Sequence, residues 1–486
     1  MMASVLRDRR TVWIIAVISF LLFVVGNLPW QLDDYDQAKQ AFTSFEMVKE
    51  GHWFYQRTPH EHVATKPPLV AWISAGLFSV TRSWELAWRL PSLLAAIALL
   101  VLLFRAANCA YGPIAGLVAL SAFGLNLLSP RLATLVRTDM PLALVIFLMG
   151  LLIWQKTRRQ EEWKFRDRVY LFVLLTISML IKGPIVYAFL LPGIALFQWR
   201  YGRSQSPGVP CCSAWPGWWP WIVSLAVFLL WVIGGAWFQP GFFNEVVIRE
   251  FLGRFGETVH RPQPLYFYLP HLLHKFAPWS VLLVLFCGIS LAEHRWRVPT
   301  ALREMSPETF WLLCWSVGGL IVMSLIPSKR VDRIFPIIPP LCLLLAAQAA
   351  DRVGVLRQAY LVVAVVFAIF FSAGYATWKT VTGYRDHRDA LAIFGRDVCN
   401  EAKAHRLRYE VVSSKDEGLL LYLQKMHYIK PDRAVAEWKA GNLDALVASS
   451  EKASTLMPRL PGATVSQIKS GDKEKEEGTD YVLIVH

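Results

Sequence analysis

Residues 12–30 read VWIIAVISFLLFVVGNLPW, and a polar stretch, Leu32-Asp33-Asp34-Tyr35-Asp36-Gln37, begins two residues later. The apolar run has close to the roughly 20 residues that a helix needs to cross a bilayer. Helices are suited to lipid because they satisfy their own backbone hydrogen bonds. The sequence therefore predicts an all-α polytopic membrane protein with about 11 transmembrane helices. The other apolar runs lie near 90–107, 112–129, 138–155, 169–182, 184–198, 219–237, 275–292, 309–326, 334–350 and 359–378.

The composition supports the same class of protein. Hydrophobic residues make up 55% of the 486 residues and charged residues 18%, whereas soluble domains carry roughly 25% charged residues. The net charge of +14 comes largely from short loops between the apolar runs, as is typical of oriented membrane proteins, so we expect no nucleic-acid partner. The 7 cysteines are scattered and include no C-x-x-C pair, which indicates neither a disulfide framework nor a thiolate metal site.

The distribution of Lys and Arg predicts the orientation. The basic segment Arg7-Asp8-Arg9-Arg10 places the N-terminus in the cytoplasm, and no convincing cleavage site follows, so we expect an uncleaved first helix. The run 67–80 is short for a span and is typical of an interfacial segment. If it lies on the outer face, the basic loops near 156–168, 199–203, 294–297 and 351–357 are all cytoplasmic. We therefore predict a bacterial inner membrane protein whose active site and C-terminus are periplasmic.

The character of the chain changes after residue 378. Residues 1–378 form the predicted transmembrane domain, with periplasmic loops at 31–89 and 238–274. Farther along, the apolar runs shorten, charges of both signs mix, and residues 480–485 have the composition of a strand. We predict a small soluble periplasmic α/β domain over 379–486.

The predicted orientation places charges of both signs at the outer face. The preference of Lys and Arg for the cytoplasmic side does not explain these charges. Charged residues at membrane depth are candidates for function. A carboxylate can remove the proton of an acceptor, and cations can hold a phosphate and neutralise it as it leaves. The sequence thus favours group transfer from a lipid-phosphate donor to a hydroxyl or amine. The candidates are Asp33, Asp34, Asp36 and Asp139, the cations Lys66, Arg137, Lys182, Lys329, Arg330 and Arg333, and Glu250, Arg254 and His260 in the long loop.

Several short motifs occur in a fixed order along residues 12–350. They are Asp33-Asp34, Lys66-Pro67-Pro68, Arg89-Leu90-Pro91-Ser92, Arg137-Thr138-Asp139, Lys182-Gly183-Pro184, and Ser328-Lys329-Arg330 followed by Asp332-Arg333 and Pro336. This ordered set resembles the C-type-fold glycosyltransferases that use polyprenyl-phosphate sugars. That superfamily contains the bacterial lipid A aminoarabinose transferases and the protein O-mannosyltransferases.

The resemblance implies roles for the candidate residues. Asp33, or its neighbour Asp34, would be the general base that activates the acceptor. Lys66 would contact the donor phosphate, with help from the late basic motif. The sugar would move from an undecaprenyl-type phosphate in one displacement, with inversion at its anomeric carbon. The residues assigned to substrate binding are Lys66, Arg137, Asp139, Lys182, Glu250, Arg254, His260, Lys329, Arg330 and Arg333.

The chain also departs from the aminoarabinose transferases. Its acidic pair is Asp-Asp in place of Asp-Glu, and Arg333 stands where that subgroup has a tyrosine. Thr65 and Phe251 stand where those enzymes carry a glutamate and a histidine associated with a metal. We therefore predict no metal ligands and no required cofactor, while a divalent cation is able in principle to share the neutralisation of phosphate.

Alternatives for these residues and for the function stay open at this point. Asp33 and Asp34 would suit helix caps, and Asp36 is better explained as a solvated helix residue. Lys66 and Lys182 would suit snorkelling, and Arg137 and Asp139 would suit a pair with each other. An amphipathic interfacial helix would explain most of the loop 238–274. The acceptor is lipid A, another envelope glycan or lipid, or a protein. A transporter or flippase of lipid-linked sugars would instead show inverted repeats and polar residues at the midplane. A phosphoethanolamine-type transferase would need a nucleophile and metal-ligating histidines in a large soluble domain.

Overall fold

The computed structural model describes residues 8–32, 35–201, 214–254, 262–351, 355–414, 416, 418–470 and 480–486. The chain divides into two compact units. The second unit combines the C-terminal part of the chain with two segments from its N-terminal part. The first unit comprises Met1–Gly26, Thr65–Val70 and Arg89–Ala376, and the second comprises Asn27–Ala64, Ala71–Trp88 and Thr377–His486.

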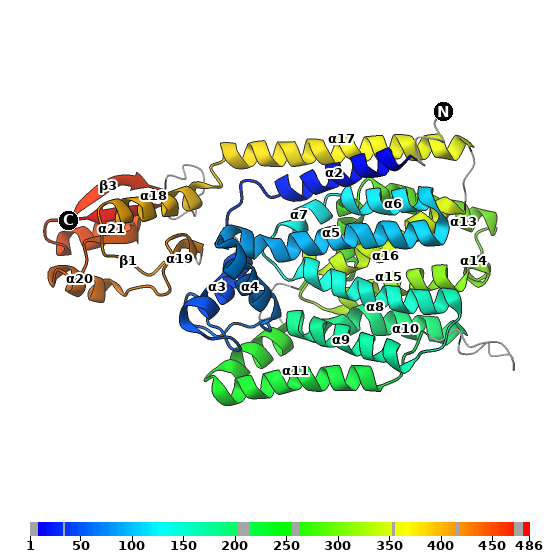
Figure 1. The fold of residues 1–486 in the computed structure, drawn as a ribbon, viewed down its shortest axis with the longest axis horizontal. Helices are drawn as coiled ribbons and strands as arrows, with labels where there is room; N and C mark the ends of the chain where they lie inside the picture. Colours follow the sequence, from blue (N-terminus) through cyan, green and yellow to red (C-terminus); the bar gives the residue numbers. More distant parts are fainter. Residues whose placement is uncertain are drawn as a thin grey trace. The chain divides into compact units, whose positions relative to one another are not determined.

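The first unit is built from long apolar helices, and Figure 1 shows α8, α9, α10 and α15 running side by side. Its main helices are α2 (Arg9–Val25), α5 (Trp84–Tyr111), α6 (Pro113–Gly124), α8 (Asp139–Arg159), α9 (Phe165–Lys182), α10 (Ile185–Tyr201), α11 (Trp219–Phe238), α13 (Trp279–Glu293), α15 (Pro307–Leu325), α16 (Ile338–Ala350) and α17 (Val355–Arg385). Shorter elements join them, namely α7 (Ser129–Ala133), η1 (Phe243–Phe251), η2 (Leu252–Arg254), η3 (Leu265–Phe267), α12 (Tyr268–Lys275), α14 (Val298–Glu304) and η4 (Val331–Ile337).

The close packing of α10 on α15 depends on glycine. A Cβ added at Gly318 would lie 2.5 Å from the backbone nitrogen of Gly193, and one added at Gly193 would lie 2.8 Å from Trp315 Cα. Helices in lipid gain little from hydrophobic association and pack through small residues that let their backbones approach. Gly193 and Gly318 therefore set the separation of two helices that also contribute to the cavity described below.

The helices confirm a polytopic membrane protein and leave the number of spans as a prediction. Among the described residues, 6 helices are long and apolar enough to cross a bilayer, or 7 if the bent pair Leu265–Lys275 and Trp279–Glu293 forms one span. Every run expected to span contains a helix, although several of these helices are shorter than the runs. The run expected to be interfacial forms α4 (Leu69–Thr81), a 13-residue helix that is short for a span.

Two helices begin or end away from the predicted limits, each for a local reason. Within 112–129 the helix ends at Gly124, and Asn126 Oδ1 accepts the backbone N–H groups of Leu128 and Ser129, each at 2.8 Å. Such side-chain bonds compete with helix continuation. Within 275–292 the helix begins only at Trp279, after a 109° bend relative to α12. Pro278 stands at this bend, where its missing N–H interrupts helical hydrogen bonding.

The C-terminal part of the second unit is a small α/β fold, as predicted. Its strands are β1 (Tyr409–Val411), β2 (Ala445–Ser449), β3 (Thr464–Lys469) and β4 (Tyr481–Val485), in the order β1-β2-β4-β3. β1 and β2 pair in parallel, and β4 pairs antiparallel with β2 and β3. Buried side chains such as Trp438, Leu446 and Ile484 form its core. The helices are α18 (Ala390–Ala404), α19 (Gly418–Tyr422), α20 (Pro431–Lys439), α21 (Ser450–Leu456) and η5 (Met457–Arg459).

The N-terminal part of the second unit contains α3 (Tyr35–Glu50) and the loop that follows it. The buried carboxylate of Glu46 accepts the backbone N–H of Arg57 at 2.5 Å and lies 2.9 Å from His52 Nδ1. Burial raises the pKa of Glu46, and the hydrogen bonds from His52 and Arg57 oppose that rise. Glu46 thus ties the loop at 52–57 to the end of α3.

Candidate active site

A cavity of about 330 Å³ lies within the first unit. This volume falls at the lower end of the range for small-molecule sites, roughly 300–1,000 Å³. The Lys-Pro-Pro segment, the turn between α9 and α10, the η1 and η2 helices, the end of α15, and η4 all contribute to it. The lining residues are Thr65, Lys66, Pro67, Lys182, Pro184, Ile185, Ala188, Glu250, Leu252, Val322, Met323, Ile326 and Arg333.

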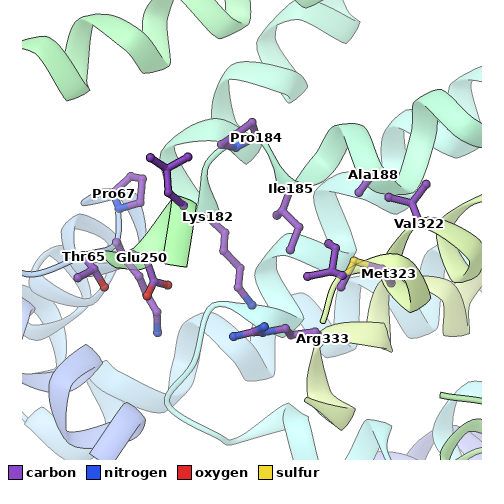
Figure 2. A pocket seen from close by; sticks show the side chains of 13 residues that line it. Thr65, Pro67, Lys182, Pro184, Ile185, Ala188, Glu250, Val322, Met323 and Arg333 are labelled. Atoms are coloured by element: carbon purple, nitrogen blue, oxygen red, sulfur yellow. The ribbon is translucent and has the colours of Figure 1, made fainter. Parts of the chain in front are cut away.

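The lining combines an apolar wall with a small set of charges. Figure 2 shows Ala188, Val322 and Met323 on one side, while the side chains of Lys182 and Arg333 extend towards each other. Lys66 adds a third cation, and Glu250 adds a carboxylate. An apolar pocket with few charged groups suits a ligand that joins a hydrocarbon to an anion.

Lys182 is fixed by the turn that carries it and by an ion pair. Gly183 follows it with a φ of 72°, a left-handed conformation that glycine adopts without steric cost. The Lys182 ammonium lies 2.5 Å from Asp139 Oδ1, and the two side chains are 12% and 8% exposed. A buried cation requires such a partner. Asp139 also begins α8, where a negative charge favours the helix N-terminus.

Asp332 makes a second buried ion pair beside the first. Its Oδ2 accepts Arg137 Nη1 at 2.6 Å, and its Oδ1 lies 4.0 Å from Arg131 Nη1. The sequence alternative in which Arg137 and Asp139 pair with each other therefore differs from the observed arrangement, in which Asp139 pairs with Lys182. Asp332 was not among the predicted site residues, although a lone carboxylate within the basic late motif was a usable signal.

Two side chains of the late basic motif donate to backbone carbonyls, one within the motif and one in another segment. Arg333 Nη1 donates to the carbonyl of Ser328 at 2.7 Å, and Lys329 Nζ donates to the carbonyl of Gln263 at 2.9 Å. Burial lowers the pKa of Lys329. These bonds hold the turn before η4 and direct Arg333 to the cavity, whereas Lys329 and Arg330 do not line it.

The Arg-Leu-Pro-Ser motif supports the loop that leads into α8. Arg89 Nη1 donates to the carbonyl of Thr134 at 3.1 Å, and Ser92 Oγ donates to the carbonyl of Leu135 at 2.8 Å. Both side chains are buried. The motif therefore satisfies backbone acceptors in the segment that presents Arg137 and Asp139.

The structure places the other predicted site residues as follows. Lys66, Lys182, Glu250 and Arg333 meet at the cavity, and Arg137 and Asp139 lie in ion pairs outside its lining. The predicted bases, Asp33 and Asp34, and His260 lie outside the described residues, as does the side chain of Arg254.

The described residues offer little support for a metal at this site. Thr65, where the aminoarabinose transferases carry a glutamate, contributes only a neutral hydroxyl to the lining, and hard or borderline divalent cations favour carboxylates and imidazoles. Elsewhere among the described residues, Glu46, Glu50 and His52 have their ligand atoms within 4.8 Å of one another. Both carboxylate oxygens of Glu46 are already engaged by His52 and Arg57. The role of Glu46 in holding the loop at 52–57 therefore explains why these three residues lie together. The absence of a required cofactor stays a prediction.

Comparison with known proteins identifies the class. A family model described as dolichyl-phosphate-mannose-protein mannosyltransferase matches residues 65–211. Over its whole length the fold is similar to the crystal structure of ArnT from Cupriavidus metallidurans bound to undecaprenyl phosphate, with a TM-score of 0.69, 18% identity and 97% of each chain covered. It is also similar to the oligosaccharyltransferase AglB from Archaeoglobus fulgidus, with a TM-score of 0.51, 14% identity, and 92% of this chain and 69% of that one covered. The chain therefore has an ArnT-like fold.

The sequence relatives include two proteins that share one description. An undecaprenyl phosphate-alpha-4-amino-4-deoxy-L-arabinose arabinosyl transferase from Yersinia pestis (strain Pestoides F) is 27% identical over 394 residues, which cover 77% of this chain. The protein of the same description from Serratia proteamaculans (strain 568) is 34% identical over 138 residues, 28% of this chain and 23% of the relative. The match spans 65% of the length of the Yersinia relative. The chain is thus similar in sequence, over part of its length, to a mannosyltransferase family model and to these arabinosyl transferases.

Proposed function

We propose that this protein is an inverting glycosyltransferase that moves a sugar from a polyprenyl-phosphate donor to an acceptor in the bacterial envelope. The observation that carries the proposal is the cavity that combines an apolar wall with Lys66, Lys182 and Arg333. The apolar wall suits the first part of a prenyl chain, and the cations suit its phosphate. The relatives named above act on undecaprenyl-phosphate-linked sugars by their descriptions, which supports this choice of donor.

The cations have a role that grows during the reaction. The donor is a phosphodiester with one negative charge, and its departure as a phosphate monoester adds further negative charge. Groups that bind the developing charge better than the starting charge lower the barrier. Lys182, held by Asp139, and Arg333, held by Ser328, are fixed before the donor arrives, so they need little reorganisation.

The proposed reaction is one displacement. An acceptor hydroxyl or amine attacks the anomeric carbon, its bond to the sugar forms, and the bond between that carbon and the phosphate oxygen breaks. The electron pair leaves with the polyprenyl phosphate, and the acceptor proton passes to a carboxylate, Asp33 or Asp34. The acceptor is lipid A, another envelope lipid or glycan, or a protein. We place the reaction at the periplasmic face of the inner membrane, with no required cofactor.

The test is transfer of labelled sugar from undecaprenyl-phosphate donors to an envelope extract by the purified protein. We expect product with the wild type, none above background with Asp33→Asn, and near wild-type transfer with the matched control Asp36→Asn. Loss with Asp34→Asn in place of Asp33→Asn would move the base by one residue. No product from any donor, together with movement of the donor across liposomes, would favour the flippase alternative.

A further inference from the structure

The C-terminal part of the second unit contacts the chain just before the predicted catalytic carboxylates. The backbone N–H of Leu32 donates to Tyr422 Oη at 2.7 Å. Tyr422 is the last residue of α19. The Leu32 side chain is buried, with 1% exposed. A residue far along the chain thus binds the backbone one residue ahead of Asp33.

A second contact from α19 lies against the carbonyl group of Leu32. A Cβ added at Gly418 would lie 2.5 Å from the carbonyl oxygen of Leu32. No side chain fits at that distance, so the backbone of α19 lies directly against Leu32. Both polar backbone groups of Leu32 therefore face the first and last residues of α19.

The segment before Leu32 is held from the end of α17. Lys379 Nζ donates to Asn27 Oδ1 at 3.2 Å, and a Cβ added at Gly383 would lie 2.6 Å from Pro29 Cδ. On the far side of the carboxylates, α3 begins at Tyr35 and packs on α19. Residues 377–422 thus hold the chain both before and after the two-residue acidic segment.

We infer that the C-terminal domain is a positioning element for the acidic segment, and that Tyr422 and Gly418 of α19 are its positioning residues. The catalytic consequence rests on the proposed function, in which Asp33 or Asp34 is the base. A general base works only within hydrogen-bonding reach of the proton that it removes, and small displacements of reacting groups slow catalysis strongly. The contacts with Tyr422 and Gly418 fix the backbone of Leu32, to which the predicted base is directly bonded.

The experiment compares Tyr422→Phe with Tyr428→Phe in the purified full-length protein in nanodiscs. Tyr428 is a matched control because its Oη donates to a backbone carbonyl in the same unit, that of Asp416, at 2.7 Å. Two readouts are needed. Hydrogen exchange of peptides that contain Leu32 reports the contact directly, and steady-state transfer from undecaprenyl-phosphate sugars separates kcat from the KM of the donor.

We expect Tyr422→Phe to speed exchange at Leu32 and to lower kcat about tenfold with an unchanged donor KM. Tyr428→Phe should change neither quantity at these sites. Gly418→Ala should give the same signature more strongly because its Cβ displaces the Leu32 carbonyl. Equal loss of kcat in both tyrosine variants, or unchanged kcat and unchanged exchange in Tyr422→Phe, would overturn the inference.

Failure of the proposed function would look different. In that case the wild type itself transfers no sugar from any polyprenyl-phosphate donor. Exchange at Leu32 then decides the positioning contact by itself, since faster exchange in Tyr422→Phe alone supports it and equal exchange in all variants overturns it.

Discussion

Two ion pairs of the first unit and one of the second lie in different surroundings. In the first unit, Asp139 with Lys182 and Arg137 with Asp332 pair at 2.5 Å and 2.6 Å, with every side chain at most 12% exposed. In the second unit, Arg408 and Asp444 pair at 2.9 Å with 58% and 32% exposed. Breaking a buried pair strands a charge away from water, whereas an exposed pair is solvated whether or not it forms. The buried pairs hold cations in one place near the cavity, and the exposed pair acts mainly as a surface contact.

The largest expected effect comes from removing the carboxylate of Asp139. Asp139→Asn leaves Lys182 buried without its carboxylate, so we expect the free energy of unfolding to fall by about 3–5 kcal/mol, with transfer lost. Denaturant unfolding in detergent measures the first effect. The double variant Asp139→Asn with Lys182→Met should recover much of the stability and none of the activity, because it removes the stranded charge and also a phosphate ligand. Full stability in Asp139→Asn alone would contradict the pairing.

The second buried pair should respond in the same way as the first. Asp332→Asn leaves the Arg137 guanidinium buried without its carboxylate, so we again expect a loss of about 3–5 kcal/mol. The control is Arg131→Ala, whose guanidinium is 39% exposed and 4.0 Å from Asp332, and which should cost at most about 1 kcal/mol. The same unfolding measurement applies. A larger loss from Arg131→Ala than from Asp332→Asn would reverse the assignment.

Two arginines of the late basic motif allow a test of which cations bind the donor. Arg333 lines the cavity and Arg330 does not, although only two residues separate them in sequence. We expect Arg333→Met to raise the donor KM about tenfold, near 1.4 kcal/mol, and Arg330→Met to change it less than about twofold. Steady-state transfer at varied donor concentration measures both. Equal effects would show that the motif acts as a diffuse positive surface.

The smallest effect belongs to the exposed pair, and it fades in acid. Hydrogen bonds from Arg408 lower the pKa of Asp444 to about 2, below its unfolded value of about 3.9. The stabilisation is therefore complete above about pH 4 and is lost as the pH falls through about 2. Asp444→Asn should lower the melting temperature of the full-length protein slightly at pH 7, and the difference from the wild type should shrink as the pH falls towards 2. A difference that does not shrink in acid would assign the stabilisation to groups other than this pair.

Much of the architecture was predictable because apolar runs and turn residues act locally. The run at 67–80 is short and became α4, and the residues at 480–485 have strand composition and form β4. The helix limits were less predictable at Asn126 and Pro278. There a side-chain hydrogen bond or a missing N–H decides where a helix ends or bends.

The site was predictable in its residue types and less so in its pairings. The cations Lys66, Lys182 and Arg333 were chosen because topology alone does not explain them, and they do meet at one cavity. The partner of Arg137 lies 195 residues away in sequence, so no local pattern favours Asp332 over the nearer Asp139. The contacts of Leu32 with α19 also join residues far apart in sequence, and no sequence motif predicts them.

The central claim is that the charged end of the cavity binds a lipid-linked phosphate. The most direct measurement is the Kd for undecaprenyl phosphate of the purified protein, for the wild type and for a Lys66→Met, Arg333→Met double variant, with Arg330→Met as control. We predict that the double variant binds at least about tenfold more weakly and that the weakening shrinks at high salt, while the control matches the wild type. Equal Kd values for all three proteins would contradict the assignment of this cavity to the donor.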